Sequence, residues 1–431
     1  MQIKKFRVPH RKTQRRWRVP PALKRGEETF EGLGLLEEVT GETGLVLWQS
    51  LRDVLLWAEA QDDERAALFT PDAETARMAM ILAAGLDAEV EEPLGALARL
   101  LSRPEATPEE LVSLACRRVA QWGDGQGMLA TALAFAQAAA TVTPGDAAAA
   151  FAVGKLARRR AEYARAETWF RRAVALARQS GDWATYALSF IGLGSLSRQR
   201  GNLPASRRFL VRAVRAAKRN SLHAVEACAL HDLFGVAVEA ERVEEAQELA
   251  RAAFEAYGPG SDLLPRLAHD VAYWWITQGN FSRAVPVLHS VLPHLDEQPI
   301  RLMTMANLAR AAGATGDREG FRTAWDRAFD LLRDGSVDET AAQALLELAH
   351  GAASLSLWDR AESAAREALE IGSRRNEAKI RLTAESLLDS VRHHRAVESR
   401  RATGAGREVA HAADALAEDM VRTLSKAQAV A

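Results

Sequence analysis

Apolar residues recur along this chain at intervals of three and four, and runs that alternate strictly between apolar and polar residues are absent. This spacing places the apolar side chains on one face of an α-helix, and it continues through nearly the whole sequence. Glycine followed by a polar residue interrupts the pattern at 201–202, 279–280 and 316–317. Because glycine readily adopts the left-handed conformation that ends a helix, each pair predicts the turn inside a helical hairpin.

Alignment on these turns gives six hairpins in tandem. The first small residue of each second helix recurs after 40, 40, 38, 37 and 40 residues, at Ala166, Ser206, Ala246, Ala284, Phe321 and Ala361. A second small or apolar position follows seven residues later, at Ala173, Ala213, Ala253, Val291, Ala328 and Ala368. Phe321 is large where its counterparts are small, so the register of the fifth hairpin stays open by one residue.

Small residues also mark the first helices. Gly154 and Gly194 stand where the two helices of a hairpin are expected to approach most closely, and Phe170 and Leu210 would fill the space toward the next hairpin. This spacing resembles the tetratricopeptide repeat (TPR) family over roughly residues 145–372, with units longer than the usual length of about 34 residues. The tyrosine typical of the first helix is mostly missing, and Phe234 stands where glycine is expected. The resemblance implies an all-α, right-handed α-solenoid of TPR-like hairpins that recognises protein or peptide partners.

The rest of the chain is expected to cap the array, because the ends of a solenoid must be covered. Helices are expected at 44–60, 73–86 and 92–103, and the last helix carries Val409, Ala413, Leu416, Met420 and Leu424 on one side. That helix could associate with a second copy, dock in the groove or simply cap the end. The expected segments are a basic tail (1–26), an acidic helical cap (27–105), a degenerate hairpin (106–144), the array (145–375), a capping helix (376–398) and a linker with the amphipathic helix (399–431).

Charge is unevenly distributed although the net charge of the 431 residues is only −1. Residues 1–26 hold ten Lys or Arg and no acid, whereas residues 27–100 hold seventeen acids against four bases. With Trp17 as a stacking group, the tail could bind nucleic acid. A disordered tail, or one folded back on the acidic segment, is the competing interpretation.

Cys116 and Cys228 fit no disulfide framework, and neither a signal peptide nor a membrane span is recognisable. Together these observations predict a cytoplasmic protein.

Catalytic patterns are missing from the sequence. The chain has no phosphate-binding glycine loop, no His-Glu-x-x-His and no recognisable cysteine nucleophile motif, so we expect neither an enzyme nor a bound cofactor. The pairs His231-Asp232 and His269-Asp270 lie 38 residues apart, on the first helices of neighbouring hairpins. They could form a metal site, but no third ligand is apparent, and contacts to a partner are the favoured interpretation.

The first helices are expected to line the inner wall of the solenoid. This wall would change from basic at its beginning to mixed polar and aromatic, which suits a peptide or helix of acidic character. The candidate partner-binding residues are Lys155, Arg158, Arg159, Arg198, Gln199, His231, Asp232, His269, Asp270, Tyr273, Asn307, Arg310 and His350, with Glu347 on the same wall. The predicted function is that of a non-catalytic scaffold or adaptor in a bacterial-type cytoplasm. The alternatives are a ligand- or peptide-sensing regulator that acts through a partner, and nucleic-acid association through residues 1–26.

Overall fold

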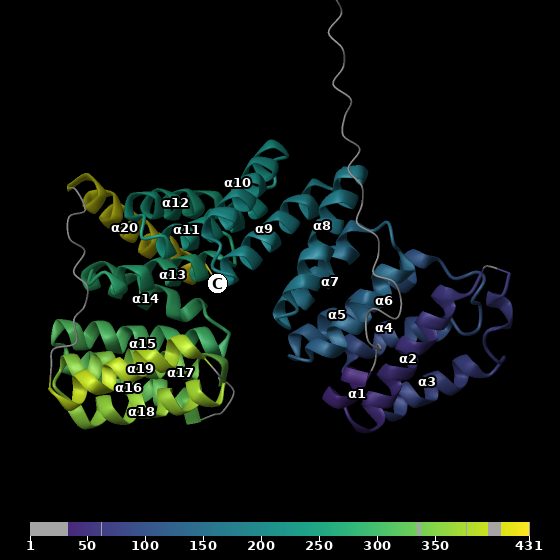
Figure 1. Cartoon of the computed structure of the whole chain (residues 1–431), viewed down its shortest axis with the longest axis horizontal. Coiled ribbons are helices and arrows are strands. Elements are labelled where there is room, and N and C mark those ends of the chain that lie inside the picture. Colours follow the sequence, from purple (N-terminus) through teal and green to yellow (C-terminus); the bar gives the residue numbers. More distant parts are fainter. Residues whose placement is uncertain (1–32, 62, 334–337, 376, 395–406, 431) are drawn as a thin grey trace, which may run out of the picture. The chain divides into compact units, whose positions relative to one another are not determined.

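The structure is a computed structural model that describes residues 33–61, 63–333, 338–375, 377–394 and 407–430. The described residues form twenty α-helices and two short 3-10 helices, without a β-strand (Figure 1). This confirms the all-α solenoid of helical hairpins. The chain divides into two compact units, residues 1–225 and 226–431. The basic tail, 1–26, lies outside the described residues.

The described part of the first unit begins with a helical cap. Trp57 is buried in this cap, and its indole nitrogen donates a hydrogen bond of 2.6 Å to the carbonyl of Pro104. Arg77 pairs with the buried carboxylate of Asp53 in the cap at 2.6 Å. The helices of the cap are α1 (Leu33–Glu38), α2 (Gly41–Glu59), η1 (Arg65–Ala67), α3 (Ala73–Ala83) and α4 (Ala88–Arg99).

Helical hairpins form the rest of the chain. The first unit contains α5 (Glu109–Gly125) with α6 (Leu129–Val142), α7 (Ala147–Arg159) with α8 (Tyr163–Ser180), and α9 (Trp183–Gln199) with α10 (Leu203–Arg219). The next hairpins are α11 (His223–Glu239) with α12 (Val243–Tyr257), α13 (Leu264–Thr277) with α14 (Phe281–Val291) and η2 (Leu292–His294), α15 (Gln298–Thr315) with α16 (Arg318–Arg333), and α17 (Asp338–Ser354) with α18 (Trp358–Arg374). They are followed by α19 (Ala378–Arg392) and α20 (Arg407–Val430).

All seven hairpins share one turn geometry. The residue two positions before each second helix has a positive φ, and the next residue donates its N–H to the carbonyl five positions earlier, at 2.8–2.9 Å. This is the six-residue hydrogen bond of a Schellman motif, which satisfies a carbonyl left free at the helix end. Glycine supplies the left-handed residue at 127, 201, 279 and 316, whereas Ala161, Glu241 and Ser356 adopt the same conformation with a side chain.

The register of the repeats follows from these turns. In each of the six predicted hairpins, the first small position is the fourth residue of the second helix, and Phe321 occupies that place in α16. Phe321 is buried there, so the register chosen for the fifth hairpin is confirmed. In α6 the same place is taken by Ala132, with Ala136 and Ala139 also buried. Its turn, at Gly127, precedes the turn at Ala161 by only 34 residues, so a spacing of about forty did not reveal the register of this degenerate hairpin.

Glycine marks the closest approaches of helices. A Cβ at Gly154 would lie 2.7 Å from the Phe170 ring, and one at Gly194 would lie 2.7 Å from Leu210, so both glycines mark the expected close approach within a hairpin. Phe170 also reaches the next hairpin as expected, because a Cβ at Gly192 would lie 2.5 Å from its ring. A tighter approach joins neighbouring hairpins: a Cβ at Gly313 of α15 would lie 2.2 Å from the carbonyl oxygen of Gly351 in α17. The repeat spacing did not predict this contact.

The last helix packs against the second helices of its own unit. Its apolar face is buried, with Leu416 and Met420 fully enclosed, and its acidic residues Asp414 and Asp419 pair with Arg283 of α14 and Arg251 of α12. The imidazole of His294 also lies 3.0 Å from the carbonyl oxygen of Leu424. The helix therefore occupies neither the wall of first helices nor the end of the array, and its apolar face gives no reason to expect self-association.

Candidate functional site

The strongest polar cluster of the second unit is centred on the carboxylate of Asp270 in α13. Its Oδ2 lies 3.0 Å from Nε2 of His231 in α11, and its Oδ1 lies 3.1 Å from Nδ1 of the adjacent His269. Asp270 and His231 thus join two successive first helices, as the 38-residue spacing of the His-Asp pairs predicted. Burial raises the pKa of Asp270, but the hydrogen bonds and charges of both imidazoles outweigh it and hold the pKa well below its usual range. The carboxylate is therefore ionised at neutral pH while 44% of its side chain stays exposed.

The other side of His231 faces a tyrosine and a thiol. Its Nδ1 lies 3.3 Å from the hydroxyl of Tyr257 at the end of α12, and that hydroxyl lies 3.7 Å from Sγ of Cys228. If His231 is neutral, Nε2–H donates to Asp270 and Nδ1 accepts from Tyr257. If it is an imidazolium, Nδ1–H donates instead and the hydroxyl turns to Cys228. Burial raises the pKa of both Tyr257 and Cys228, so neither group supplies an anion at neutral pH.

Asn307 of α15 contacts this cluster through His269. Its Nδ2 lies 3.4 Å from Nε2 of His269, and its side chain is completely buried. Its Oδ1 is also buried, without a partner among the described residues. Asn307 is therefore enclosed rather than exposed on the wall, and it contacts the cluster through His269.

A second cluster is centred on the buried carboxylate of Glu347 in α17. Its Oε1 accepts hydrogen bonds from Tyr273 of α13 at 3.2 Å and from Gln343 at 2.6 Å, and its Oε2 accepts from Arg310 of α15. Three first helices are joined through one carboxylate, and its charge is compensated by the guanidinium. Next to it, burial and the charge of Arg310 lower the pKa of His350 to about 4, with Glu347 opposing the shift. His350 is therefore neutral at physiological pH.

The basic residues predicted for the first unit lie near the ends of its first helices. Lys155 pairs with Asp124 of α5 at 2.8 Å, and Arg159 pairs with the same carboxylate. Arg158 and Arg198 are half-buried in the last turns of α7 and α9. Gln199 is exposed at the end of α9.

Several members of these clusters were missed by sequence reasoning. Asp124 and Tyr257 lie outside the positions that were aligned, and Gln343 was passed over one turn before Glu347. The sequence holds no signal for Tyr257, because it reaches the cluster from a second helix. Asp232, predicted with His231, lies half-buried beside it on α11.

The described residues hold no group of three or more His, Cys, Asp or Glu side chains arranged to bind a metal ion. The two histidines and Asp270 instead bond to one another and to neighbouring side chains. No helix in the described part of the chain is both long and apolar enough to cross a membrane.

Comparisons with known proteins support the fold. Neither protein-family models nor curated proteins give a match. Among solved structures, the chain is similar to a signal-transduction ATPase with numerous domains that carries a TPR sensor, from Pyrococcus horikoshii, with a TM-score of 0.52, 12% identity and coverage of 91% of this chain and 60% of that one. It is also similar to aspartyl phosphate phosphatase F from Bacillus subtilis, with a TM-score of 0.47, 10% identity and coverage of 85% and 98%. The turns, the register and the first of these similarities identify the protein as a TPR-like helical-repeat protein.

Proposed function

We propose that this protein is a non-catalytic scaffold or adaptor that binds a protein or peptide segment on its first helices. The observation that carries the proposal is the Asp270 cluster, in which an ionised carboxylate is held by two imidazoles and still presents 44% of its side chain to solvent. Structural carboxylates such as Glu347 are enclosed instead, with only 3% of the side chain exposed. An exposed but immobilised acceptor is ready to receive a donor from a partner at little entropic cost.

The neighbours of Asp270 extend this surface along the second unit. Half-buried Tyr273 lies one turn further along the same helix, and half-buried His231 and Asp232 lie on α11. A partner segment that crosses α11 and α13 would meet aromatic surface together with two carboxylates. This part of the wall therefore favours a segment that contributes hydrogen-bond donors or a positive charge.

The first unit favours a different chemistry. Arg158, Arg159 and Arg198 lie in the last turns of α7 and α9, and Lys155 lies one turn before Arg159 on α7. Asp124 pairs with Lys155 and Arg159. We infer that acidic segments bind here, as the sequence predicted. Charge reversal at Arg158 and Arg159 tests this, and an unchanged affinity for an acidic partner would overturn it.

The experiment for Asp270 begins with the full-length protein and partners isolated from the native host by pull-down and mass spectrometry. The affinity of each partner is then measured by calorimetry for wild type, Asp270→Asn and the control Glu248→Gln. The control removes the same charge from an exposed position on α12. We expect Asp270→Asn to weaken binding about tenfold or more, equal to about 1.4 kcal/mol, and the control to leave it unchanged. Equal affinities for all three proteins would refute the proposal.

The other functions that the sequence left open have their own tests. A sensing regulator would change its helix packing on binding, which small-angle scattering of free and bound protein can detect. Nucleic-acid association depends on residues 1–26, so deletion of that segment would abolish retention on single-stranded nucleic acid while leaving the wall of first helices in place.

A further inference from the structure

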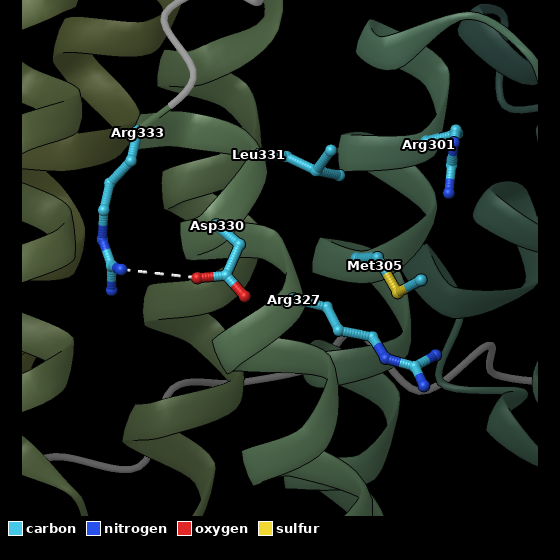
Figure 2. A pocket seen from close by; sticks show the side chains of 6 residues that line it. All are labelled: Arg301, Met305, Arg327, Asp330, Leu331 and Arg333. Atoms are coloured by element: carbon cyan, nitrogen blue, oxygen red, sulfur yellow. Dashed lines mark hydrogen bonds and ion pairs between the residues drawn. The ribbon is translucent and has the colours of Figure 1, made fainter.

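In the second unit, a groove on the second helices is not covered by any residue that the structure describes. A hollow of about 250 Å³ lies between α14 and α16 over α15. Through Met305 and Arg327 it continues into a hollow of about 590 Å³ that is lined by residues of α15 and α16. The walls of this groove carry half-buried apolar side chains, Val285, Leu292 and Leu331. We call it the α14–α16 groove. Figure 2 shows its wider end, where Leu331 and Arg327 of α16 extend toward the helix that carries Arg301 and Met305.

This groove corresponds, one repeat later, to the groove between α12 and α14 in which α20 packs. Polar contacts of α20 with α12, α14 and η2 come from Arg251, Arg283 and His294. Advancing these positions by 38, 37 and 37 residues, the spacings of the repeat, gives His289, Gly320 and Leu331. All three line the α14–α16 groove.

From this equivalence we propose that the α14–α16 groove binds an amphipathic helix of a partner protein in the pose of α20. The packing site of α20 shows which kind of helix such a groove accepts. The apolar face of α20 is buried, and the charged residues beside that face pair with residues at the edges of the groove. The pose runs parallel to α14, because Asp414 lies at the start of that helix and Leu424 lies beyond its end.

The charges of the rims specify the partner. Asp317 and Glu319 lie where the first half of the bound helix would rest. Arg301 and Arg327 lie where the second half would rest, whereas Arg333 is already paired with Asp330 at 3.4 Å. The complementary helix is therefore basic in its first half and acidic in its second.

A second copy of α20 is a poor occupant of this groove. Its first half carries Asp414 and Glu418, which would face the acidic rim, and its second half carries Arg422 and Lys426, which would face the arginines. The charge pattern thus distinguishes a foreign helix from self-association.

Two labelled peptides test the proposal with the full-length protein. One has the sequence of residues 411–426, and the other carries the changes Asp414→Lys, Glu418→Lys, Arg422→Glu and Lys426→Glu while keeping the apolar stripe. Fluorescence anisotropy should show the redesigned peptide binding about tenfold or more tighter than the native sequence. Equal binding of the two peptides, or no binding of the redesigned one, would overturn the proposal.

Charge-reversal variants locate the binding. Arg327→Glu should weaken the redesigned peptide about tenfold or more, whereas Arg322→Glu, an exposed position of α16 outside the groove lining, should not. Equal loss in both variants would place the peptide elsewhere. Sedimentation adds a further outcome, because dimerisation that Arg327→Glu abolishes would assign the groove to a second copy and refute the partner helix. Asp270→Asn should leave peptide binding intact. Failure of the groove proposal can therefore be distinguished from failure of the proposed function at Asp270.

Discussion

His231 and Asp270 are 39 residues apart, yet Nε2 of the imidazole lies 3.0 Å from Oδ2 of the carboxylate. The contact joins the first helices of two successive hairpins at the same height. Stacking of near-identical units makes such contacts recur, because each repeat brings its counterpart positions into register with the next. Here the recurring position carries the polar cluster on which the proposed binding surface is built.

Removal of the Asp270 charge should destabilise the second unit moderately. Asp270→Asn keeps the shape but leaves two imidazoles without their ionic acceptor, at a cost of about 1–2 kcal/mol, limited by the exposure of the side chain. Because the pKa of Asp270 is lowered in the folded state, its contribution is present above the unfolded pKa near 3.8 and disappears as pH falls through the folded value. Urea unfolding at pH 7 and pH 3, with Asp262→Asn as an exposed control, measures both effects. If the urea midpoint of Asp270→Asn at pH 7 equals that of the wild type, this prediction is contradicted.

His350 should make the protein less stable in mild acid. The unfolded chain binds a proton near pH 6.5, whereas the folded protein binds it only near pH 4, so stability falls as pH drops from 6.5 toward 4. The expected loss at pH 5 is about 2 kcal/mol relative to pH 7.5. His350→Gln should remove this part of the pH dependence, as shown by urea midpoints at the two pH values. Identical pH dependence in variant and wild type would refute the assignment.

Glycine should stabilise the turns in which a side chain occupies the left-handed region. Ala161 and Ser356 have φ of 61° and 55°, and L-residues reach this region at a cost of about 1 kcal/mol. We therefore expect Ala161→Gly and Ser356→Gly each to raise the free energy of unfolding by up to about 1 kcal/mol. The matched control, Ala164→Gly at an exposed position in the first turn of α8, should lower it instead. Thermal unfolding, followed by circular dichroism, measures the direction of the stability change in each variant. Destabilisation by both turn substitutions would count against the prediction.

A methyl group at Gly313 should disrupt the packing of α15 on α17. The new Cβ would lie 2.2 Å from the carbonyl oxygen of Gly351, and neither backbone can move without displacing its hairpin. Overpacking of this kind costs about 1–3 kcal/mol or more. Gly125→Ala, whose Cβ would meet nothing within 4 Å, serves as the control. A Gly313→Ala protein with an unchanged melting temperature would show that the helices are further apart than described.

Several features of this fold were accessible from sequence because they are local. The Schellman turns at Gly201, Gly279 and Gly316 depend on the conformational freedom of single residues, and the small position at Ala284 or Ala361 depends on its place in one helix. The register at Phe321 stayed open by one residue in the sequence, and the structure confirms the alignment that placed Phe321 at the small position. The hairpin of α5 and α6 was expected as a degenerate hairpin at 106–144, but its register was not recognised because its distance from the next unit is shorter than the others.

The clusters that make the site could be predicted only in part. Pairing of the two His-Asp motifs followed from their spacing, but the enclosure of Asn307 and the compensation of Arg310 by Glu347 did not. Two of the basic residues were expected to be available to a partner, and Asp124 of the preceding hairpin pairs with both. Which side chains meet across a repeat boundary depends on helix crossing, and no single helix encodes it.

By itself the sequence determined the helices, their hairpin turns and the period at which they repeat, because these follow from backbone preferences and from apolar spacing within one element. The tertiary structure decided which carboxylates are exposed or enclosed, the division at residue 225, and the seating of α20 on α12 and α14 rather than on the first helices. These outcomes depend on contacts between residues that are distant in the sequence. For each such surface, many partners are possible, and the burial of apolar area and the pairing of charges decide among them.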